Sequence, residues 1–245
     1  TTSENITQFT ILVAALAERI YLNLGYAVYT RSNHTISESF GIWLAGTLFP
    51  ELKNAKKYQS IGKQILEREA SVQIFPDGGY AMHSLNYHRF VLHIYLFAIR
   101  IGELNNQKLA SSVYQAVERS LDYLSTLCDL QTGLVPQYGS NDGALVLPLN
   151  NCDYNDYRPL LQLGYYTLYK KRLLPAGEWD EDIFWFFGQE ALDAAITPIS
   201  QHRLAAALRR LNVLVQQAVV KLLVVEHLVA AHRDRAAVDL AADPA

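Results

Sequence analysis

Hydrophobic residues recur at helical spacing along most of this 245-residue chain. Near the N-terminus one such stripe predicts an amphipathic helix with Asn5 or Thr7 as its N-cap. Its members are Leu12, Ala15, Leu16, Ile20 and Leu24. Similar periodicity, punctuated by Pro and Gly, predicts the other helices. One of these helices follows Asn33-His34-Thr35, and the next runs over 50–73. Another carries residues 87–99 and ends near Gly102. The remaining helices are predicted over 107–127, 157–171 and 178–194.

Two segments between these helices lack helical periodicity. Residues 75–79 contain one Pro and two Gly, which predicts a turn. Residues 129–153 contain three Gly and two Pro, which predicts a long irregular loop, and only 144–147 could form a short strand. Long loops inside compact helical domains often carry function.

Helices joined alternately by short turns and longer loops predict an all-α fold of antiparallel helical hairpins. The natural closed form is an α/α toroid, although a solenoid shares the same local signals and we find no tandem repeat. We predict that residues 1–200 form a partial toroid-like domain. Residues 201–245 contain no Tyr, Phe, Trp or Gly and are rich in Ala, Leu, Val and Arg. This tail is interpreted either as a terminal packing helix or as a segment foreign to the preceding domain.

Composition limits the function classes. Half of the residues are hydrophobic and the formal net charge is −3, which argues against disorder and against a basic surface for nucleic acid. Cys128 and Cys152 flank the long loop and could form a disulfide. No Cys or His spacing indicates a zinc site, and no cofactor is predicted. The sequence also predicts no membrane span, and it starts without a signal-peptide pattern, so either there is none or an upstream part is missing.

Amide, imidazole and phenol groups stand beside two predicted helix starts. They occur in Asn33-His34 and in Ser84-Leu-Asn-Tyr87-His88-Arg89. Cleaving a uronic-acid polymer by β-elimination requires a group that neutralises the carboxylate, a base for the adjacent carbon-bound proton, and an acid for the departing oxygen. Asn33 and His34 can serve the carboxylate, Tyr87 can serve as acid or base, and His88 can hold the Tyr87 hydroxyl. None of these roles needs a metal.

Each of these residues also has a structural interpretation. Asn33 could be a helix cap and His34 a loop histidine. Tyr87 could be a packing residue, and Arg89 and Glu38 could form surface ion pairs. On the residues alone, the structural interpretation of Asn33 is favoured.

The order of several motifs resembles the heparinase II/III-like polysaccharide lyases, over about residues 10–195. Asn33-His34 is followed by Phe49-Pro50-Glu51, by Gln73-Ile-Phe-Pro-Asp77-Gly78 and by the Ser-x-x-Tyr-His element at 84–88. The resemblance implies catalytic roles for Asn33, His34 and Tyr87, and we predict that His88 also belongs to the catalytic group because it can hold the Tyr87 hydroxyl. The substrate-binding residues that we predict beside them are Arg89, Glu38, Asn141, Asp142, Tyr138 and Arg158.

The chain also departs from that family. A Glu often found before the Ser of the Tyr-His element is absent, as in relatives associated with surface-polysaccharide gene clusters. The family carries a C-terminal β-sandwich that supplies a second catalytic His, and nothing after Ser200 has the pattern of strands. The resemblance therefore implies a truncated toroid that needs the missing domain, an acidic polysaccharide such as a glycosaminoglycan as its substrate, and a location in the bacterial periplasm or cell envelope.

Two other functions are consistent with the sequence. An α/α-toroid glycoside hydrolase would use paired carboxylates, for which Asp77, Asp142 and Asp156 are candidates. A non-catalytic glycan-binding or assembly protein would hold sugar in the same cleft without cleaving it.

Overall fold

The structure is a computed structural model that describes residues 2–146 and 148–196. The chain divides into two units, Thr1–Ile199 and Ser200–Ala245, and the predicted tail lies outside the described residues. The helices of the first unit are α1 (Ser3–Thr30), α2 (Asn33–Leu48), α3 (Ala55–Gln73), α4 (Leu85–Leu104), α5 (Ser111–Leu127), α6 (Arg158–Tyr169), the 3-10 helix η1 (Glu178–Asp180), α7 (Glu181–Phe187) and α8 (Gln189–Leu192). The all-α fold class expected from the sequence is confirmed within these residues.

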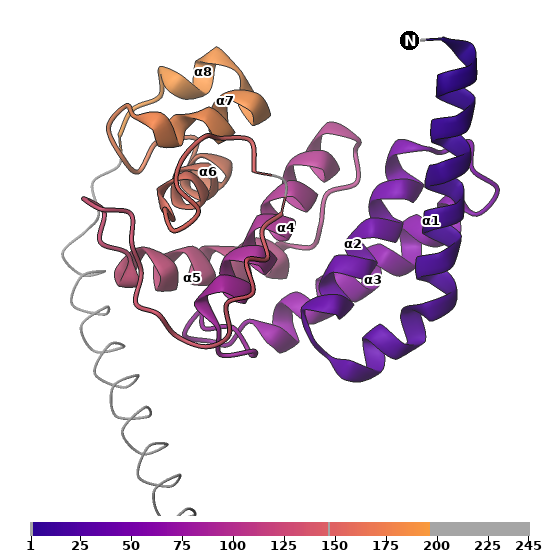
Figure 1. The fold of residues 1–245 in the computed structure, drawn as a ribbon, viewed down its shortest axis with the longest axis horizontal. Coiled ribbons are helices and arrows are strands. Elements are labelled where there is room, and N and C mark those ends of the chain that lie inside the picture. Colours follow the sequence, from indigo (N-terminus) through magenta and orange to yellow (C-terminus); the bar gives the residue numbers. More distant parts are fainter. Residues whose placement is uncertain (1, 147, 197–245) are drawn as a thin grey trace, which may run out of the picture. The chain divides into compact units, whose positions relative to one another are not determined.

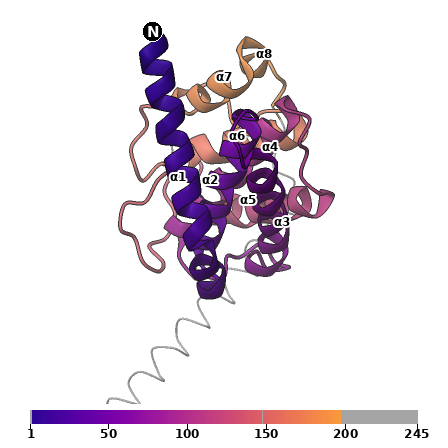
Figure 2. The same ribbon diagram turned by 90° about the vertical axis from the view of Figure 1, so that its right-hand side faces the viewer.

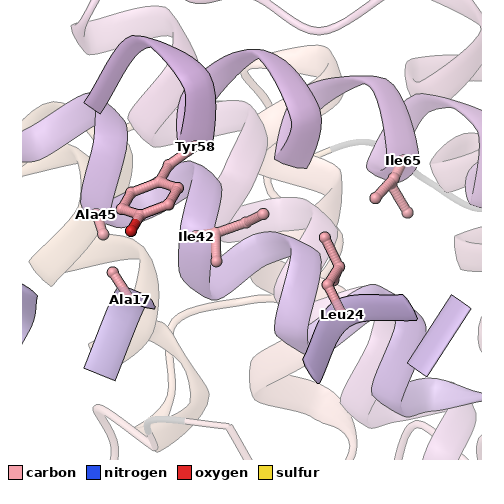
Figure 3. Close-up of a cluster of buried hydrophobic side chains, with 6 residues drawn as sticks. All are labelled: Ala17, Leu24, Ile42, Ala45, Tyr58 and Ile65. Carbon is pink, nitrogen blue, oxygen red and sulfur yellow. The ribbon is translucent and has the colours of Figure 1, made fainter. Parts of the chain in front are cut away.

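Short connections make neighbouring helices pack as hairpins. α1 lies alongside α2, and α2 packs against α3, as both ribbon views show (Figure 1, Figure 2). One apolar cluster joins these three helices (Figure 3), and its members are Ala17, Leu24, Ile42, Ala45, Tyr58 and Ile65. α4 is buried over most of its surface. It contacts α2 earlier in the chain and α5 and α6 later in the chain, so it connects the N-terminal helices with those that follow.

α1 leaves much of its apolar surface uncovered. Phe9, Leu12, Leu16 and Leu22 are all more than half exposed, and an apolar groove of about 390 Å³ runs between α1 and α2. By length and composition, α1 is the one helix in the described residues that could cross a membrane. Core helices and signal sequences pass the same criterion, so the absence of a membrane span stays a prediction.

Several expected boundaries need correction. The third helix begins at Ala55 and not at Pro50, because residues 49–55 form turns through Leu52 N–H to Phe49 O and Ala55 N–H to Leu52 O. The helix expected over 178–194 is broken at Gly188, whose φ of 79° lies outside the helical range.

The long connection between α5 and α6 has the irregular structure expected of it. It contains no strand over 144–146, and residue 147 is outside the described residues. Cys128 and Cys152 are both free, so the disulfide considered from the sequence is not formed.

Candidate active site

The start of α2 is capped by Ser32 and not by Asn33. Ser32 Oγ accepts a hydrogen bond from the His34 N–H at 3.3 Å, and Thr35 Oγ1 accepts one from the Ser32 N–H at 3.2 Å. This reciprocal pair satisfies N–H groups that the first helical turn leaves free. The side-chain amide of Asn33 is therefore not required as a cap.

Asn33 and His34 face different surroundings. Asn33 is 8% exposed, and its backbone N–H points to Met82 Sδ at 3.4 Å. The His34 side chain is 69% exposed, and its Nδ1 lies 3.9 Å from Glu38 Oε1, one turn later on the same helix. Glu38, predicted to bind substrate, is thus an i,i+4 neighbour that can hold the His34 ring.

A buried polar network fixes the start of α2 from beneath. Gln73 Nε2 donates to the Ser32 carbonyl at 3.2 Å and to Glu69 Oε2 at 2.9 Å. Tyr80 donates its hydroxyl hydrogen to Gln73 Oε1 at 3.1 Å. Burial, followed by the charge of Glu69, raises the pKa of Tyr80, which keeps it a donor. These residues were not predicted as part of the site, because Gln73 lies 41 positions from Ser32 and such a separation gives no local signal.

The start of α4 is tied to the long loop. Ser84 Oγ accepts from the Tyr87 N–H at 3.1 Å as an N-cap and donates to the Ser140 carbonyl at 2.6 Å. The Leu85 N–H donates to the Tyr138 carbonyl at 3.1 Å. Gly139, with φ of 76°, makes this approach feasible, because a Cβ there would lie 2.1 Å from the His83 carbonyl oxygen. Tyr138 and its neighbours are thereby held against α4.

Tyr87 and Asp142 form a direct pair, although they are 55 positions apart. The Tyr87 hydroxyl donates to Asp142 Oδ2 at 2.5 Å. This hydrogen bond is the main cause that raises the pKa of Tyr87, and the same bond lowers the pKa of Asp142. In this arrangement Tyr87 stays protonated, so it can donate its proton as a general acid.

His88 is a core residue, which corrects the expectation that it polarises the Tyr87 hydroxyl. It is 1% exposed, and its Nε2 shares a hydrogen bond of 2.5 Å with Ser120 Oγ on α5. Its ring packs against Tyr80 and Tyr123, with centroids 6.0 and 5.4 Å away. Burial lowers the pKa of His88 to about 3, so it is neutral at pH 7 and cannot contact a substrate directly.

Two predicted substrate-binding arginines behave differently. Arg158 pairs with Asp156 at 2.7 Å, donates to the Gln131 carbonyl at 3.0 Å and lies over the Trp179 ring, so its guanidinium is occupied within the protein. This corrects the expectation that Arg158 is free to bind substrate. Arg89 is 3% exposed and has no carboxylate partner among the ion pairs of the described residues.

A pocket lies where the loop crosses the start of α4. Its walls include the predicted residues Arg89, Tyr138 and Asn141, together with Asn86 and Tyr154. Tyr154 donates its hydroxyl hydrogen toward Asn86 Oδ1 at 2.7 Å and Asn141 Oδ1 at 2.6 Å, so these residues form one polar wall. Asn86 and Tyr154 were not among the predicted site residues.

The two helix starts meet through the turn that precedes α4. Met82 contacts the backbone of Asn33, and Tyr80 joins the Gln73 network beneath Ser32. Tyr87 lies close enough to Tyr80 to raise its pKa. The contacts of Met82 and Tyr80 join the turn before α4 to the start of α2, and Tyr87, which bonds to Asp142, lies on α4 after that turn. The described residues contain no group of three or more His, Cys, Asp or Glu arranged to hold a metal ion.

Comparisons with known proteins agree with the arrangement of motifs. The family described as Heparinase II/III N-terminus matches residues 1–140. A heparin-sulfate lyase of Bacteroides thetaiotaomicron is 28% identical over 148 residues, which are 60% of this chain and 20% of that protein. A heparin-sulfate lyase of Bacteroides stercoris is 34% identical over 74 residues, or 30% and 11% of the two chains. A crystal structure of heparinase III is 26% identical, with a TM-score of 0.46, over 57% of this chain and 21% of that one. The matched regions thus span a fifth or less of the curated relatives.

Proposed function

The chain belongs to the heparinase II/III N-terminus family, and from that premise we propose that it cleaves a uronic-acid-containing glycan by metal-independent β-elimination. Its curated relatives carry the name heparin-sulfate lyase, which supports a polysaccharide lyase. The observation that carries the mechanism is the Tyr87-Asp142 hydrogen bond between the start of α4 and the long loop.

Asn33 neutralises the substrate carboxylate in this mechanism. Its amide is not used for capping, because Ser32 caps α2, and its backbone is fixed against Met82. An amide N–H donor strengthens its bond as negative charge develops on the carboxylate side of the enolate, so it stabilises the transition state more than the bound substrate. His34 assists as an exposed donor from the next position.

Tyr87 moves the proton. Its hydroxyl, kept protonated by Asp142, donates to the departing glycosidic oxygen as the bond between that oxygen and the sugar carbon breaks. The carbon-bound proton leaves to a base, and the electron pair of that bond forms the new carbon–carbon double bond. Tyr87 can serve as this base only in its phenolate form, which the interaction with Asp142 disfavours. We therefore assign the base to a group outside the described residues, and the β-sandwich histidine expected from the resemblance fits this role.

The three carboxylates considered for a hydrolase are all engaged locally. Asp77 accepts from the Gly79 N–H at 2.9 Å, Asp142 accepts from Tyr87, and Asp156 pairs with Arg158. Hydrolysis with paired carboxylates requires one of them to carry a proton as the acid. The hydrogen bond from Tyr87 lowers the pKa of Asp142, which disfavours its protonated form, so the geometry favours elimination.

The product identifies the reaction. We would incubate acidic polysaccharides with the chain alone and with the chain joined to the C-terminal domain of a relative. Elimination gives ultraviolet absorbance from an unsaturated uronate and fragments whose masses sum to that of the parent. Hydrolysis instead adds one water per cleavage and gives no absorbance. Binding without any fragment from the joined protein would contradict the proposal and favour a glycan-binding role.

A further inference from the structure

The pocket at the start of α4 has one charged residue in its lining. Twelve residues line it, and among them only Arg89 carries a formal charge. The others are apolar, amide or phenol side chains. No acidic residue in this lining opposes an incoming anion, although Arg89 also borders an adjoining pocket that contains Asp153, Asp156 and Asp182.

Arg89 has only neutral partners in the described residues. Its Nη1 donates to the Tyr154 carbonyl and its Nη2 to Asn86 Oδ1 at 2.9 Å. Its guanidinium lies over the rings of Tyr154 and Tyr157, with centroids 4.4 and 4.5 Å away. Buried cations are normally paired with an anion, because desolvation of the charge is costly. Arg158, with Asp156 beside it, follows that rule and Arg89 does not.

Two buried N–H groups of this pocket also lack an acceptor. They are Arg89 Nε and Asn86 Nδ2, on side chains of residues that are both 3% exposed. The orientation of the Asn86 amide is fixed, because its oxygen accepts from Arg89 and from the Tyr154 hydroxyl. More than nine tenths of buried polar groups have a partner. Since both orphan atoms are donors, the missing partner is an acceptor.

We propose that this pocket, which we call the Arg89 subsite, binds an oxyanion of an acidic glycan, either a carboxylate or a sulfate. The identity of the ligand as a glycan rests on the proposed function. The pocket has space of about 20 Å³, enough for one water-sized oxygen of the anionic group. One oxygen of the anionic group enters between Asn86 and Arg89, and the sugar ring stays in the mouth beside Tyr138 and Tyr154.

The Arg89 subsite differs from the position of the carboxylate at Asn33. Asn141, which accepts a hydrogen bond from Tyr154 in the subsite, directly precedes Asp142, which accepts one from Tyr87, so the long loop links the subsite to the proton-transfer pair. Asn33 lies on α2, where its backbone N–H contacts Met82 Sδ, and it is not part of the subsite lining. The subsite therefore recognises the charge on a sugar next to the one that is cleaved, which defines the substrate as a glycan with anionic groups on successive units.

Replacing Asn86 by Asp tests the subsite without removing Arg89. The substitution Asn86→Asp keeps the acceptor for Arg89 Nη2 and Tyr154, removes one orphan donor, and supplies an internal carboxylate to the guanidinium. We would measure calorimetric binding of a sulfated uronate tetrasaccharide to the whole chain. Binding by the variant is expected to be at least about 10-fold weaker, because a charge-assisted contact is lost. Asn23→Asp, an equal charge change on the exposed surface of α1, is expected to leave binding unchanged.

Comparing differently modified tetrasaccharides identifies the anion that occupies the subsite. If a carboxylate occupies the subsite, the carboxyl-reduced tetrasaccharide binds the wild-type chain weakly and no longer distinguishes it from Asn86→Asp. If a sulfate occupies it, a sulfated but carboxyl-reduced tetrasaccharide keeps the difference. Equal affinity of Asn86→Asp and wild type for every ligand would overturn the proposal and would leave a bound water as the acceptor. This test reads binding, so an absence of cleavage products contradicts the lyase function and leaves the subsite result intact.

Discussion

The starts of α2 and α4 are both capped by a serine, but the polar side chains beside the two caps differ in their exposure. Ser32 and Ser84 both accept a backbone N–H of the first turn. At α2 the adjacent His34 is open to solvent, whereas at α4 the adjacent polar side chains point into the protein or into the long loop. A side chain that is open to solvent at a helix start can meet a substrate, whereas side chains that are bonded within the protein can hold a fixed geometry. We infer that α2 contributes the carboxylate contact and α4 contributes the fixed frame.

Removing the Tyr87 hydroxyl should have the largest effect. Tyr87→Phe deletes the group assigned to proton transfer, so we expect kcat to fall about 10³-fold, within the range typical of a lost general acid. The joined protein would be assayed for unsaturated product. Its fold should survive, because the hydroxyl bonds only to the exposed Asp142. Activity within 10-fold of wild type would show that Tyr87 is not the general acid. The start of α4 would then have no assigned catalytic group.

Deleting the Asn33 amide should affect turnover almost as strongly. Asn33→Ala removes a donor to the developing charge, and we expect kcat/KM to fall about 10²-fold. Ser37→Ala is the matched control in the first turn of α2, since Ser37 Oγ bonds only to the His34 carbonyl. If both variants lose activity equally, the first turn of α2 has a structural and not a chemical role.

The pH dependence of stability should separate His88 from His34. The folded-state pKa of His88 is lowered to about 3 from an ordinary value of 6.5, so the unfolded chain takes up this proton first as the pH falls. The free energy of unfolding is not reduced by this site above pH 6.5. Between pH 6.5 and pH 3 it falls progressively, because only the unfolded chain takes up the His88 proton. At about pH 4.5 the loss for this one site is about 2–3 kcal/mol.

Urea unfolding at pH 7 and at about pH 4.5 measures this loss. His88→Gln, which cannot take up the proton, should unfold more easily at pH 7 but should lose less stability on acidification than the wild type. His34→Gln is the matched control for the loss of an imidazole at an exposed ring. His93, with its pKa lowered to about 4 by burial and then by Arg89, adds to the loss in every variant. An unchanged slope in His88→Gln would mean that His88 is accessible to solvent.

The sequence predicted the elements better than the contacts. Periodicity placed α4 across Tyr87 and Gly102, and Gly and Pro located the loop, because both signals are local. Asn86, Tyr154 and Gln73 were missed because their partners lie 41 to 68 positions away and only packing brings them together. His88 was assigned to the site because it follows Tyr87. On a helix, neighbouring residues point about 100° apart, so one faces the loop and the other faces α5.

The smallest expected effect separates the two serine caps. Ser32→Ala should lower stability by about 1 kcal/mol, the usual contribution of an N-cap. Ser84→Ala loses the same kind of cap and also the hydrogen bond to the Ser140 carbonyl, so we expect about 1 kcal/mol more.

Amide exchange locates the additional loss. In Ser84→Ala the Leu85 N–H, which donates to the Tyr138 carbonyl, should exchange faster because the loop detaches from α4 more often. In Ser32→Ala that amide should be unchanged, since Gln73 still holds the start of α2 through the Ser32 carbonyl. Equal costs and equal exchange in the two variants would mean that the loop contributes nothing to the start of α4. The position of the Tyr87-Asp142 pair would then depend on its own hydrogen bond alone. The proposed difference between α2, whose His34 is open to solvent, and α4, whose start is bonded to the loop, would no longer hold.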